Sequence, residues 1–521
     1  MIIKIILIIV FFSVMIGVGV YSKKKATNVN NFVLGGHTAG PWLTAFSYGT
    51  SYFSAVIFVG YAGQFGWKFG LASTWIGLGN AFLGSLLAWV VLGRRTRIMT
   101  NSLGSSTMPS FFGKRFDSKA LRIGASVIAF IFLIPYTASV YNGLSRLFEM
   151  AFGIPYKYCI LVMAVLTGLY VILGGYMATT INDFIQGIIM LFGIVAVVVS
   201  VLNGKGGFTQ ALIGLAEIPA DATAQVQAPG VYASFFGANP LDLLSVIVLT
   251  SLGTWGLPQM VNKFYAIKSE KSVKTGAIVS TFFAVIVAGG CYFLGGFARL
   301  FSSAPEIYKA NGAVDFDSII PTMLQNLPDI LIGIVIVLVL SASMSTLSSL
   351  VLTSASTVTI DIVKNNIVKK MDDKKQLLVI RIFIVFFVAL SVVIAWNKTT
   401  FIAQLMGISW GALAGAFLAP FFYGLYWKGV TKLSVWASFI FGVGFTITNL
   451  VLSLCEKPSF NAIQSGAIAM VAGLIIVPLV SLITPKMSKE KIDEIFTCYN
   501  TVVSVPKKMY LENDEDKVKE D

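Results

Sequence analysis

A run of hydroxyl side chains lies inside one of the most apolar parts of the sequence. The segment SASMSTLSSL, residues 341–350, contains six Ser and Thr residues between LIGIVIVLVL and VLTSASTVTI. A rotation of about 100° per residue brings positions three and four apart onto one helix face. One such face holds Ala342, Ser345, Thr346 and Ser349, and an overlapping face holds Ser345, Ser348 and Ser349.

These faces favour a cation site. Hydroxyl and carbonyl oxygens suit a hard cation such as Na⁺, and they supply no full negative charge. A single buried Ser or Thr more often bonds the carbonyl one turn earlier, or holds two helices together. Six such residues within one helical stretch favour the ion site.

One acidic residue also has two interpretations. Asp183, in TTINDFIQGIIML, comes at the start of an apolar stretch. An Asp there commonly caps its helix, whereas an ionisable residue at membrane depth is a candidate for function. If Asp183 carries the coupling ion, that ion is a proton, so proton coupling stays open beside Na⁺ coupling.

The elements that must position these residues are membrane helices. The 521 residues are 56% hydrophobic and only 12% charged, and many apolar stretches reach the length needed to cross a ~30 Å hydrocarbon core. We predict an all-α integral membrane protein with about thirteen transmembrane helices. They span 2–21, 41–63, 70–93, 121–150, 157–177, 181–202, 240–262, 275–301, 327–362, 377–396, 399–426, 433–455 and 463–484.

The distribution of charge predicts the orientation of these helices. With the N-terminus outside, most of the 38 Lys and Arg residues fall in cytoplasmic loops or the C-terminal segment, as the positive-inside rule requires. This placement also argues against nucleic acid as the reason for the net charge of +14. We expect one multi-pass transporter domain over 1–485 in the plasma (inner) membrane, in contact with the lipid bilayer, and a cytoplasmic tail over 486–521.

Two of the predicted helices contain features that interrupt a helix. The helix over 41–63 includes FSYGTSYFSAVIFVG, with Gly49 among hydroxyl residues, and the helix over 240–262 includes LTSLGTWGLPQM, with Gly256 and Pro258. They begin two possible five-helix halves, about 41–202 and 240–426. Paired interruptions at matching positions indicate the binding site of an inverted-repeat transporter, although Gly and Pro are also common in ordinary membrane helices.

These features together resemble the sodium:solute symporter family, whose bacterial members carry proline, pantothenate, sialic acid and sugars. The resemblance covers nearly the whole chain. It rests on NNFVLGGHTAGPW, GGYMATTINDFIQG, WGLPQMVNKFYAIKS, SMSTLSSLVLTSAS and GAFLAPFFYGLYW. It implies a leucine-transporter-like fold with an inverted five-helix repeat, and Na⁺ as the co-transported ion.

The resemblance also implies positions for the ions. The family's main Na⁺ site corresponds here to the backbone carbonyls of Thr50, Phe53 and Ala342 and the hydroxyls of Ser345 and Thr346. Some members have a second Na⁺ site. Its ligands correspond to Asp183, Ser345, Ser348 and Ser349.

The solute is less well determined by the resemblance. Tyr136 in IPYTAS matches a solute-facing tyrosine of the family. Proline symporters carry Asp where this chain has Tyr52, and Trp and Tyr where it has Ser251 and Thr254, which argues against proline itself. We therefore place solute binding at Tyr52, Tyr136, Ser251, Thr254, Trp255 and Gln259.

The sequence thus predicts a sodium-coupled symporter that imports a small organic solute, an amino acid or a monocarboxylate, by alternating access. The alternatives are a Na⁺-conducting channel or solute sensor on the same scaffold, and a proton-coupled symporter. An enzyme is disfavoured because the chain has a single histidine, His37, and lacks HExxH and Walker A motifs.

Overall fold

The computed structural model describes residues 2–23, 28–37, 39–221, 224–368, 371–396, 402–455, 457 and 460–500. Its described part is helical, and the only β-pairing there is an isolated bridge between Tyr308 and Val314. The α-helices are α1 (Ile2–Lys23), α2 (Val29–Leu34), α3 (Pro41–Tyr52), α4 (Ala62–Phe69), α5 (Thr74–Gly79), α6 (Arg94–Ser102), α7 (Met108–Arg115), α8 (Lys119–Phe152), α9 (Tyr156–Asn203), α10 (Phe208–Glu217), α11 (Pro240–Gly256), α12 (Pro258–Tyr265), α13 (Glu270–Gly295), α14 (Ile319–Leu324), α15 (Asp329–Thr357), α16 (Asp373–Ala395), α17 (Ile402–Tyr426), α18 (Lys432–Leu454), α19 (Ala462–Ile483) and α20 (Lys489–Thr497). Shorter 3₁₀ and π-helical segments lie between them, including η2 (Val56–Tyr61), η4 (Asn80–Leu87), η9 (Phe316–Ser318) and η10 (Val358–Ile367).

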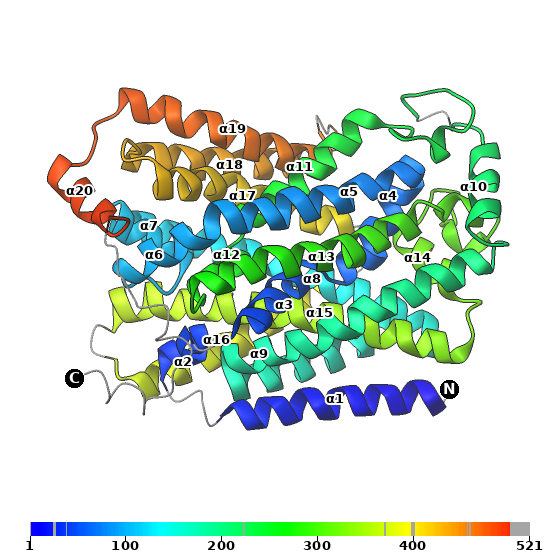
Figure 1. Ribbon diagram of the computed structural model, residues 1–521, viewed down its shortest axis with the longest axis horizontal. Coiled ribbons are helices and arrows are strands. Elements are labelled where there is room, and N and C mark those ends of the chain that lie inside the picture. The colour runs from blue at the N-terminus through cyan, green and yellow to red at the C-terminus, as the bar shows by residue number, and fades with distance from the viewer. Residues whose placement is uncertain are drawn as a thin grey trace, which may run out of the picture.

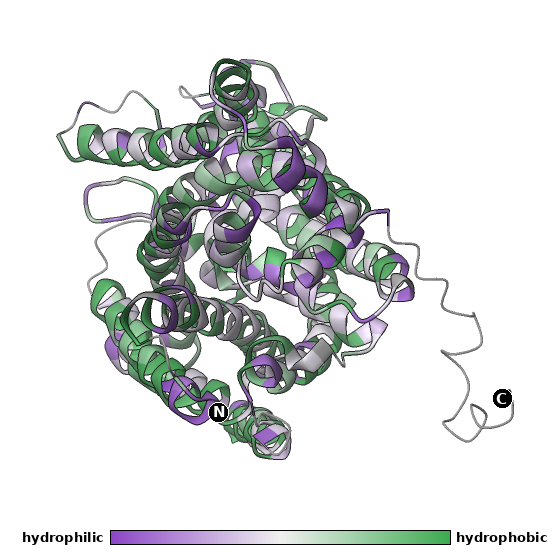
Figure 2. Ribbon diagram, turned by 90° about the vertical axis from the view of Figure 1, so that its left-hand side faces the viewer, coloured by the Kyte–Doolittle hydropathy of each residue, from purple (hydrophilic) through white to green (hydrophobic). Residues whose placement is uncertain are grey.

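The long helices run side by side along the longest axis of the molecule (Figure 1). One end carries α10 and α14, and the other carries α6, α7 and α20. Figure 2 looks along this bundle and shows the peripheral helices mostly in the hydrophobic colour. Large apolar side chains such as Phe192 and Ile9 are exposed on these helices, as expected of surfaces that face lipid.

Burial distinguishes the central helices from the peripheral ones. In the most apolar window of α15 78% of the residues are buried, and in that of α17 83%, against 22% in α1 and 33% in α16. The hydroxyl stretch 341–350 belongs to α15 and is buried throughout. The sequence feature most suggestive of an ion site therefore lies at the centre of the bundle.

The described residues form ten helices long and apolar enough to cross a membrane, or eleven if the bent pair α11 and α12 is one span. The structure thus differs from the predicted thirteen separate helices. Two continuous segments, Val56–Ser102 and Tyr156–Asn203, contain 47 and 48 residues. Within them Gly70 and Gly175 adopt positive φ angles of 63° and 55°. The predicted boundary between 157–177 and 181–202 is therefore a single glycine, without an intervening loop.

Both helices predicted to be interrupted do contain a break, although in one of them the break lies beyond the predicted position. The axes of α11 and α12 bend by 47° at their junction, where Leu257 is extended, and this confirms the break expected near Gly256 and Pro258. In the other helix, Gly49 is an ordinary helical residue of α3 packed against the Phe283 ring. The break occurs later, because α3 ends at Tyr52 and Phe53 is extended, with ψ of 129°.

Candidate functional site

The break after α3 faces the hydroxyl stretch of α15. The Ser345 hydroxyl donates to the Thr50 carbonyl over 2.9 Å and lies 3.0 Å from the Ala342 carbonyl in its own helix. The Thr346 hydroxyl approaches the carbonyl oxygens of Phe53 and Ala342 at 2.9 and 3.2 Å. The structure therefore brings together all five residues that the sequence predicts for the main ion site.

The chemistry of this cluster suits a hard cation. Three backbone carbonyls and two hydroxyls converge, and Ser345, Thr346 and Thr50 are fully buried. The bonds of Ser345 and Thr346 to Ala342 are the ordinary contacts of such residues within a helix. Each of these hydroxyls also makes a second contact, with the interrupted helix, which lies some 295 residues away in the sequence. Bonding within α15 does not account for that contact. No cluster of three His, Cys, Asp or Glu side chains suited to a metal occurs in the described part of the chain.

A second polar cluster lies beside the first. Asp183 on α9 accepts a hydrogen bond of 2.5 Å from the Ser47 hydroxyl on α3. The ammonium of Lys263, on α12, lies 3.5 Å from the same carboxylate oxygen. It donates to the hydroxyls of Ser47 and Ser349 at 2.7 and 3.1 Å. Ser349 and Ser51 share a further hydrogen bond of 2.9 Å.

This cluster contains only part of the predicted second Na⁺ site. Asp183 and Ser349 are linked through Lys263, whereas Ser348 donates to the Ser345 carbonyl within α15. Asp183 lies within α9 with a fully buried side chain, so it does not cap a helix. The second Na⁺ site stays a prediction.

The predicted solute residues fall into two groups. In the first, Tyr52 and Tyr136 approach the same indole ring: their ring centroids lie 6.1 and 5.8 Å from that of Trp410 on α17. The Tyr52 hydroxyl donates to the Thr250 carbonyl over 2.8 Å. These residues form an aromatic wall next to the break that follows α3.

The second group faces η4. The Ser251 hydroxyl lies 3.2 Å from the side-chain carbonyl oxygen of Asn80. Thr254 donates to the Gly84 carbonyl at 3.0 Å, and the Trp255 indole N–H donates to the Leu83 carbonyl at 3.0 Å. Gln259 is buried, and its side-chain oxygen has no partner in the described structure.

Several buried polar groups near this aromatic wall make no hydrogen bond of ordinary geometry with another described residue, although Asn80 lies near Tyr292 and Trp410 near Tyr136. They are the hydroxyls of Tyr61 and Tyr292, the Asn80 amide nitrogen and the Trp410 indole nitrogen. Tyr61 and Tyr292 lie near Tyr136, which places them beside the predicted solute residues. Each group can donate a hydrogen bond, and unsatisfied buried donors are unfavourable without a ligand or water.

Sequence reasoning missed Lys263, Ser47, Asn80, Tyr292 and Trp410. Lys263 had a usable signal, because a lysine next to the Gly-Pro break lies at membrane depth. The predicted span 240–262 ends one residue before it and so leaves it in a cytoplasmic loop. Trp410 and Tyr292 look like ordinary aromatic residues of apolar helices. Only their tertiary neighbours distinguish them.

Comparison with known proteins places this arrangement in context. The sequence profile of the sodium:solute symporter family matches residues 32–444. The chain is 29% identical over 486 residues to the osmoregulated proline transporter OpuE of Bacillus subtilis, covering 92% of this chain and 94% of that one. It is 31% identical over 448 residues to sodium/proline symporter 2 of Staphylococcus saprophyticus, covering 84% of each.

Solved structures resemble it in fold. A Na⁺-coupled sialic acid symporter, in a substrate-bound outward-open state, matches with a TM-score of 0.72 at 16% identity, over 94% of this chain and 99% of that one. Mhp1, a nucleobase-cation-symport-1 family transporter in a closed conformation, matches with a TM-score of 0.50 at 13% identity, over 88% and 96%.

Proposed function

This chain belongs to the sodium:solute symporter family, and from that membership we propose how its residues carry out transport. It is a multi-pass membrane protein that couples Na⁺ to the movement of a small organic solute. We propose that Na⁺ binds the carbonyls of Thr50, Phe53 and Ala342 and the hydroxyls of Ser345 and Thr346. The observation that carries this proposal is the contact of both hydroxyls with the interrupted helix.

The proposed topology is thirteen crossings with the N-terminus outside and the C-terminus in the cytoplasm. At about 1.5 Å per residue, a segment of 47 residues would extend roughly 70 Å, more than twice a ~30 Å hydrocarbon core. We therefore treat Tyr156–Asn203 as two crossings that meet at Gly175, and the chain from α3 to Ser102 as two crossings that meet at Gly70. The basic residues of α6 and α7, at one end of the bundle (Figure 1), mark the cytoplasmic side of the plasma membrane.

The proposed solute is a small zwitterionic amino acid, with L-proline as the first candidate. The buried N–H and O–H groups of Asn80, Tyr61, Tyr292 and Trp410 suit a carboxylate. The faces of Tyr52, Tyr136 and Trp410 suit a small apolar ring, and an ammonium gains from aromatic faces. The relatives named for proline transport support this choice, although Tyr52, Ser251 and Thr254 differ from the proline-type pattern. A monocarboxylate is the second candidate, because it needs only the hydrogen-bond donors that would bind a carboxylate.

In the proposed cycle, Na⁺ binds from outside and holds α15 against the break after α3. This favours the conformation in which the solute site faces outward. The solute then binds beside Tyr136 and Trp410, closure follows, and both leave toward the cytoplasm. Na⁺ and solute must each raise the affinity for the other. Each Na⁺ that crosses the full potential supplies about 2.3 kcal/mol per 100 mV.

Uptake into proteoliposomes tests this function. Radiolabelled L-proline should accumulate under an inward Na⁺ gradient and not under an equal K⁺ gradient at the same pH. Uptake driven equally well by a pH gradient without Na⁺ would favour proton coupling through Asp183. Na⁺ flux without solute accumulation would favour the channel or sensor.

Competition by analogues distinguishes the two solute candidates. Cyclopentanecarboxylate keeps the ring and the carboxylate of proline but has no nitrogen. If the solute is a zwitterion, excess cyclopentanecarboxylate should compete at least 10-fold more weakly than unlabelled proline. Equal competition would favour the monocarboxylate.

A further inference from the structure

The proposed transport cycle gives no role to Lys263, a buried lysine next to the proposed Na⁺ site. Lys263 has a side chain only 3% exposed, and Asp183 beside it is fully buried. We propose that the Lys263 ammonium is a built-in cation that takes the place predicted for a second Na⁺, so that the protein binds one Na⁺ per cycle. Only the reference to a transport cycle rests on the proposed function. The number of bound Na⁺ ions does not, because it is measured without transport.

The contacts of the ammonium are those that a cation site would provide. It reaches Asp183, Ser47 and Ser349 at 3.5, 2.7 and 3.1 Å. An ammonium has three N–H donors and no acceptor, so three oxygens satisfy it. Two of these residues, Asp183 and Ser349, belong to the predicted second Na⁺ site. The Tyr176 ring, with its centroid 5.3 Å from Nζ, adds a favourable aromatic face.

Charge also argues for one cation at this position. A buried carboxylate and a buried ammonium compensate each other, whereas either alone in a low-dielectric interior is strongly unfavourable. A Na⁺ added to the pair would place two positive charges beside one carboxylate. Asp183 keeps one oxygen, Oδ1, without a partner among the described residues. Removal of the ammonium would leave that carboxylate and its neighbouring hydroxyls available to Na⁺.

The position of Lys263 links the two interrupted helices. Lys263 lies on α12, directly after the break that follows α11, and Ser47 lies on α3, before the other break. Ser349 is one turn beyond Ser345 on α15 and bonds Ser51. The tethered ammonium thus makes, between the two halves of the repeat, the contacts that a mobile ion would otherwise make.

Equilibrium binding of ²²Na⁺ to the purified full-length protein tests the proposal, with Na⁺ alone as the probe. The wild type should bind one ion. Lys263→Gln should bind two, because the carboxylate is left without its ammonium. The double variant Lys263→Gln with Asp183→Asn should return to one. Lys4→Gln is the matched control, since Lys4 is a buried lysine in an ion pair of 2.9 Å with Asp329, and it should bind one.

Two ions on the wild type would overturn the proposal, as would a single ion on a monodisperse Lys263→Gln protein. If Lys263→Gln does not fold, Thr346→Ala in the wild-type background decides instead. No saturable binding, or one ion bound at least about 10-fold more weakly than in the wild type, supports one site, and one ion retained at wild-type affinity reveals a second. Failure of the transport function is distinguishable, because a protein that binds one Na⁺ and moves no solute leaves this inference intact.

Discussion

The Thr346 hydroxyl of α15 donates a hydrogen bond to the Phe53 carbonyl over 2.9 Å, although 293 residues separate them in the sequence. Phe53 is the extended residue at which α3 ends. A side chain of one central helix therefore satisfies a backbone oxygen that the break in another helix leaves without its helical partner. This contact makes the proposed ion site depend on the interruption itself.

Substitution at this contact should weaken Na⁺ coupling. Thr346→Ala removes one proposed oxygen ligand, and loss of one buried partner costs about 1–3 kcal/mol. The apparent KM for Na⁺ should rise roughly 10-fold or more. Ser356→Ala is the matched control, because the Ser356 hydroxyl bonds only within α15. Unchanged Na⁺ dependence of uptake in Thr346→Ala would contradict the main-site assignment.

The aromatic wall should determine the affinity for the solute. Trp410→Phe keeps a ring beside Tyr52 and Tyr136 but deletes the indole N–H proposed to meet the carboxylate. We expect the KM for proline to rise about 10-fold, measured at saturating Na⁺. Trp436→Phe, at a half-buried position on α18, should leave it unchanged. An equal effect of both substitutions would point to general destabilisation.

Gly175 should tolerate no side chain. Its φ is 55°, and an added Cβ would lie 2.6 Å from the Phe32 carbonyl oxygen. Gly175→Ala should therefore lower the thermal stability of the detergent-solubilised protein, or prevent its folding, through strain and overlap of about 1–3 kcal/mol or more. Gly168→Ala lies in the same helix with open space around it and should have no such effect.

Asp317 in η9 should make stability depend on pH. Its carboxylate accepts a hydrogen bond from the Ile402 backbone N–H at 3.3 Å, and burial raises the pKa of Asp317 to about 6. The unfolded chain loses this proton near pH 4. The free energy of unfolding should therefore decrease as the pH rises from 4 to 6, with a contribution of ~3 kcal/mol from this residue.

Asp317→Asn should accordingly raise the melting temperature above that of the wild type, and this increase should be larger at pH 7 than at pH 4. Asp117 provides a control of opposite sign, because its hydrogen bond with Lys491 lowers the pKa of Asp117. Asp117→Asn should lose more stability at pH 7 than at pH 4. Equal shifts of Asp317→Asn at both pH values would argue against a raised pKa.

The proposed orientation can be checked by labelling. In a background without the four native cysteines, Lys309→Cys and Lys119→Cys each place one exposed thiol in a loop or at a helix start. A membrane-impermeant maleimide should label Lys309→Cys in intact cells. It should label Lys119→Cys only after permeabilisation. The reverse pattern would invert the topology.

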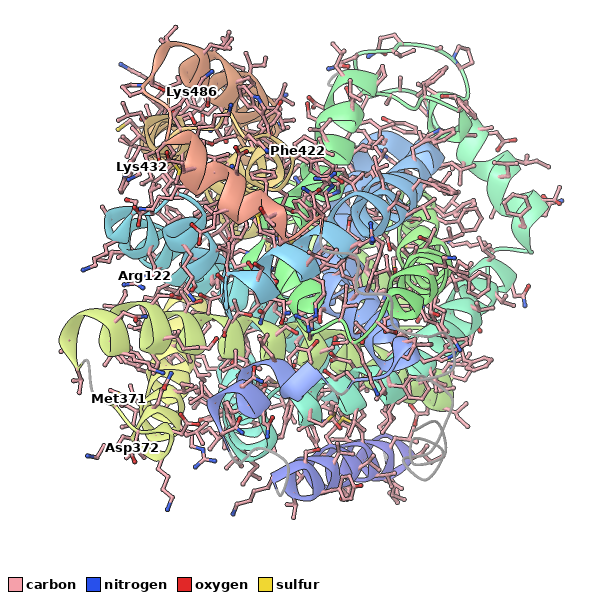
Figure 3. All side chains as sticks on the ribbon, turned by 60° about the vertical axis from the view of Figure 1, so that its left-hand side comes forward. Arg122, Met371, Asp372, Phe422, Lys432 and Lys486 are labelled. Atoms are coloured by element: carbon pink, nitrogen blue, oxygen red, sulfur yellow. The ribbon has the colours of Figure 1, made fainter. Side chains whose placement is uncertain are left out.

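Basic side chains from several helices lie at the end of the bundle that is opposite α10. Figure 3 labels Arg122, Lys432 and Lys486 toward that end, and they come from α8, α18 and the segment before α20. Elements distant in sequence thus bring basic side chains to one side of the molecule. This is the side proposed to be cytoplasmic.

The sequence by itself determined the features that follow from local pattern. Apolar length and the positions of Lys and Arg predict membrane helices, and helical periodicity places Ser345 and Thr346 on one face of α15. Gly256 and Pro258 mark the break after α11 because Pro removes a backbone donor and disfavours a helical residue before it. These signals need no knowledge of distant residues.

Only the tertiary structure decided the rest. No Gly or Pro stands at the break after α3: Phe53 is extended where Thr346, from another helix, satisfies its carbonyl. Lys263 follows directly on an apolar span and looks like a loop lysine, but the bend between α11 and α12 and the packing of α12 bring it to Asp183. Trp410 becomes part of a candidate site only when Tyr52 and Tyr136 pack against it. Each of these roles arises from contacts between distant segments, so no local window of the sequence contains the free energy that fixes it.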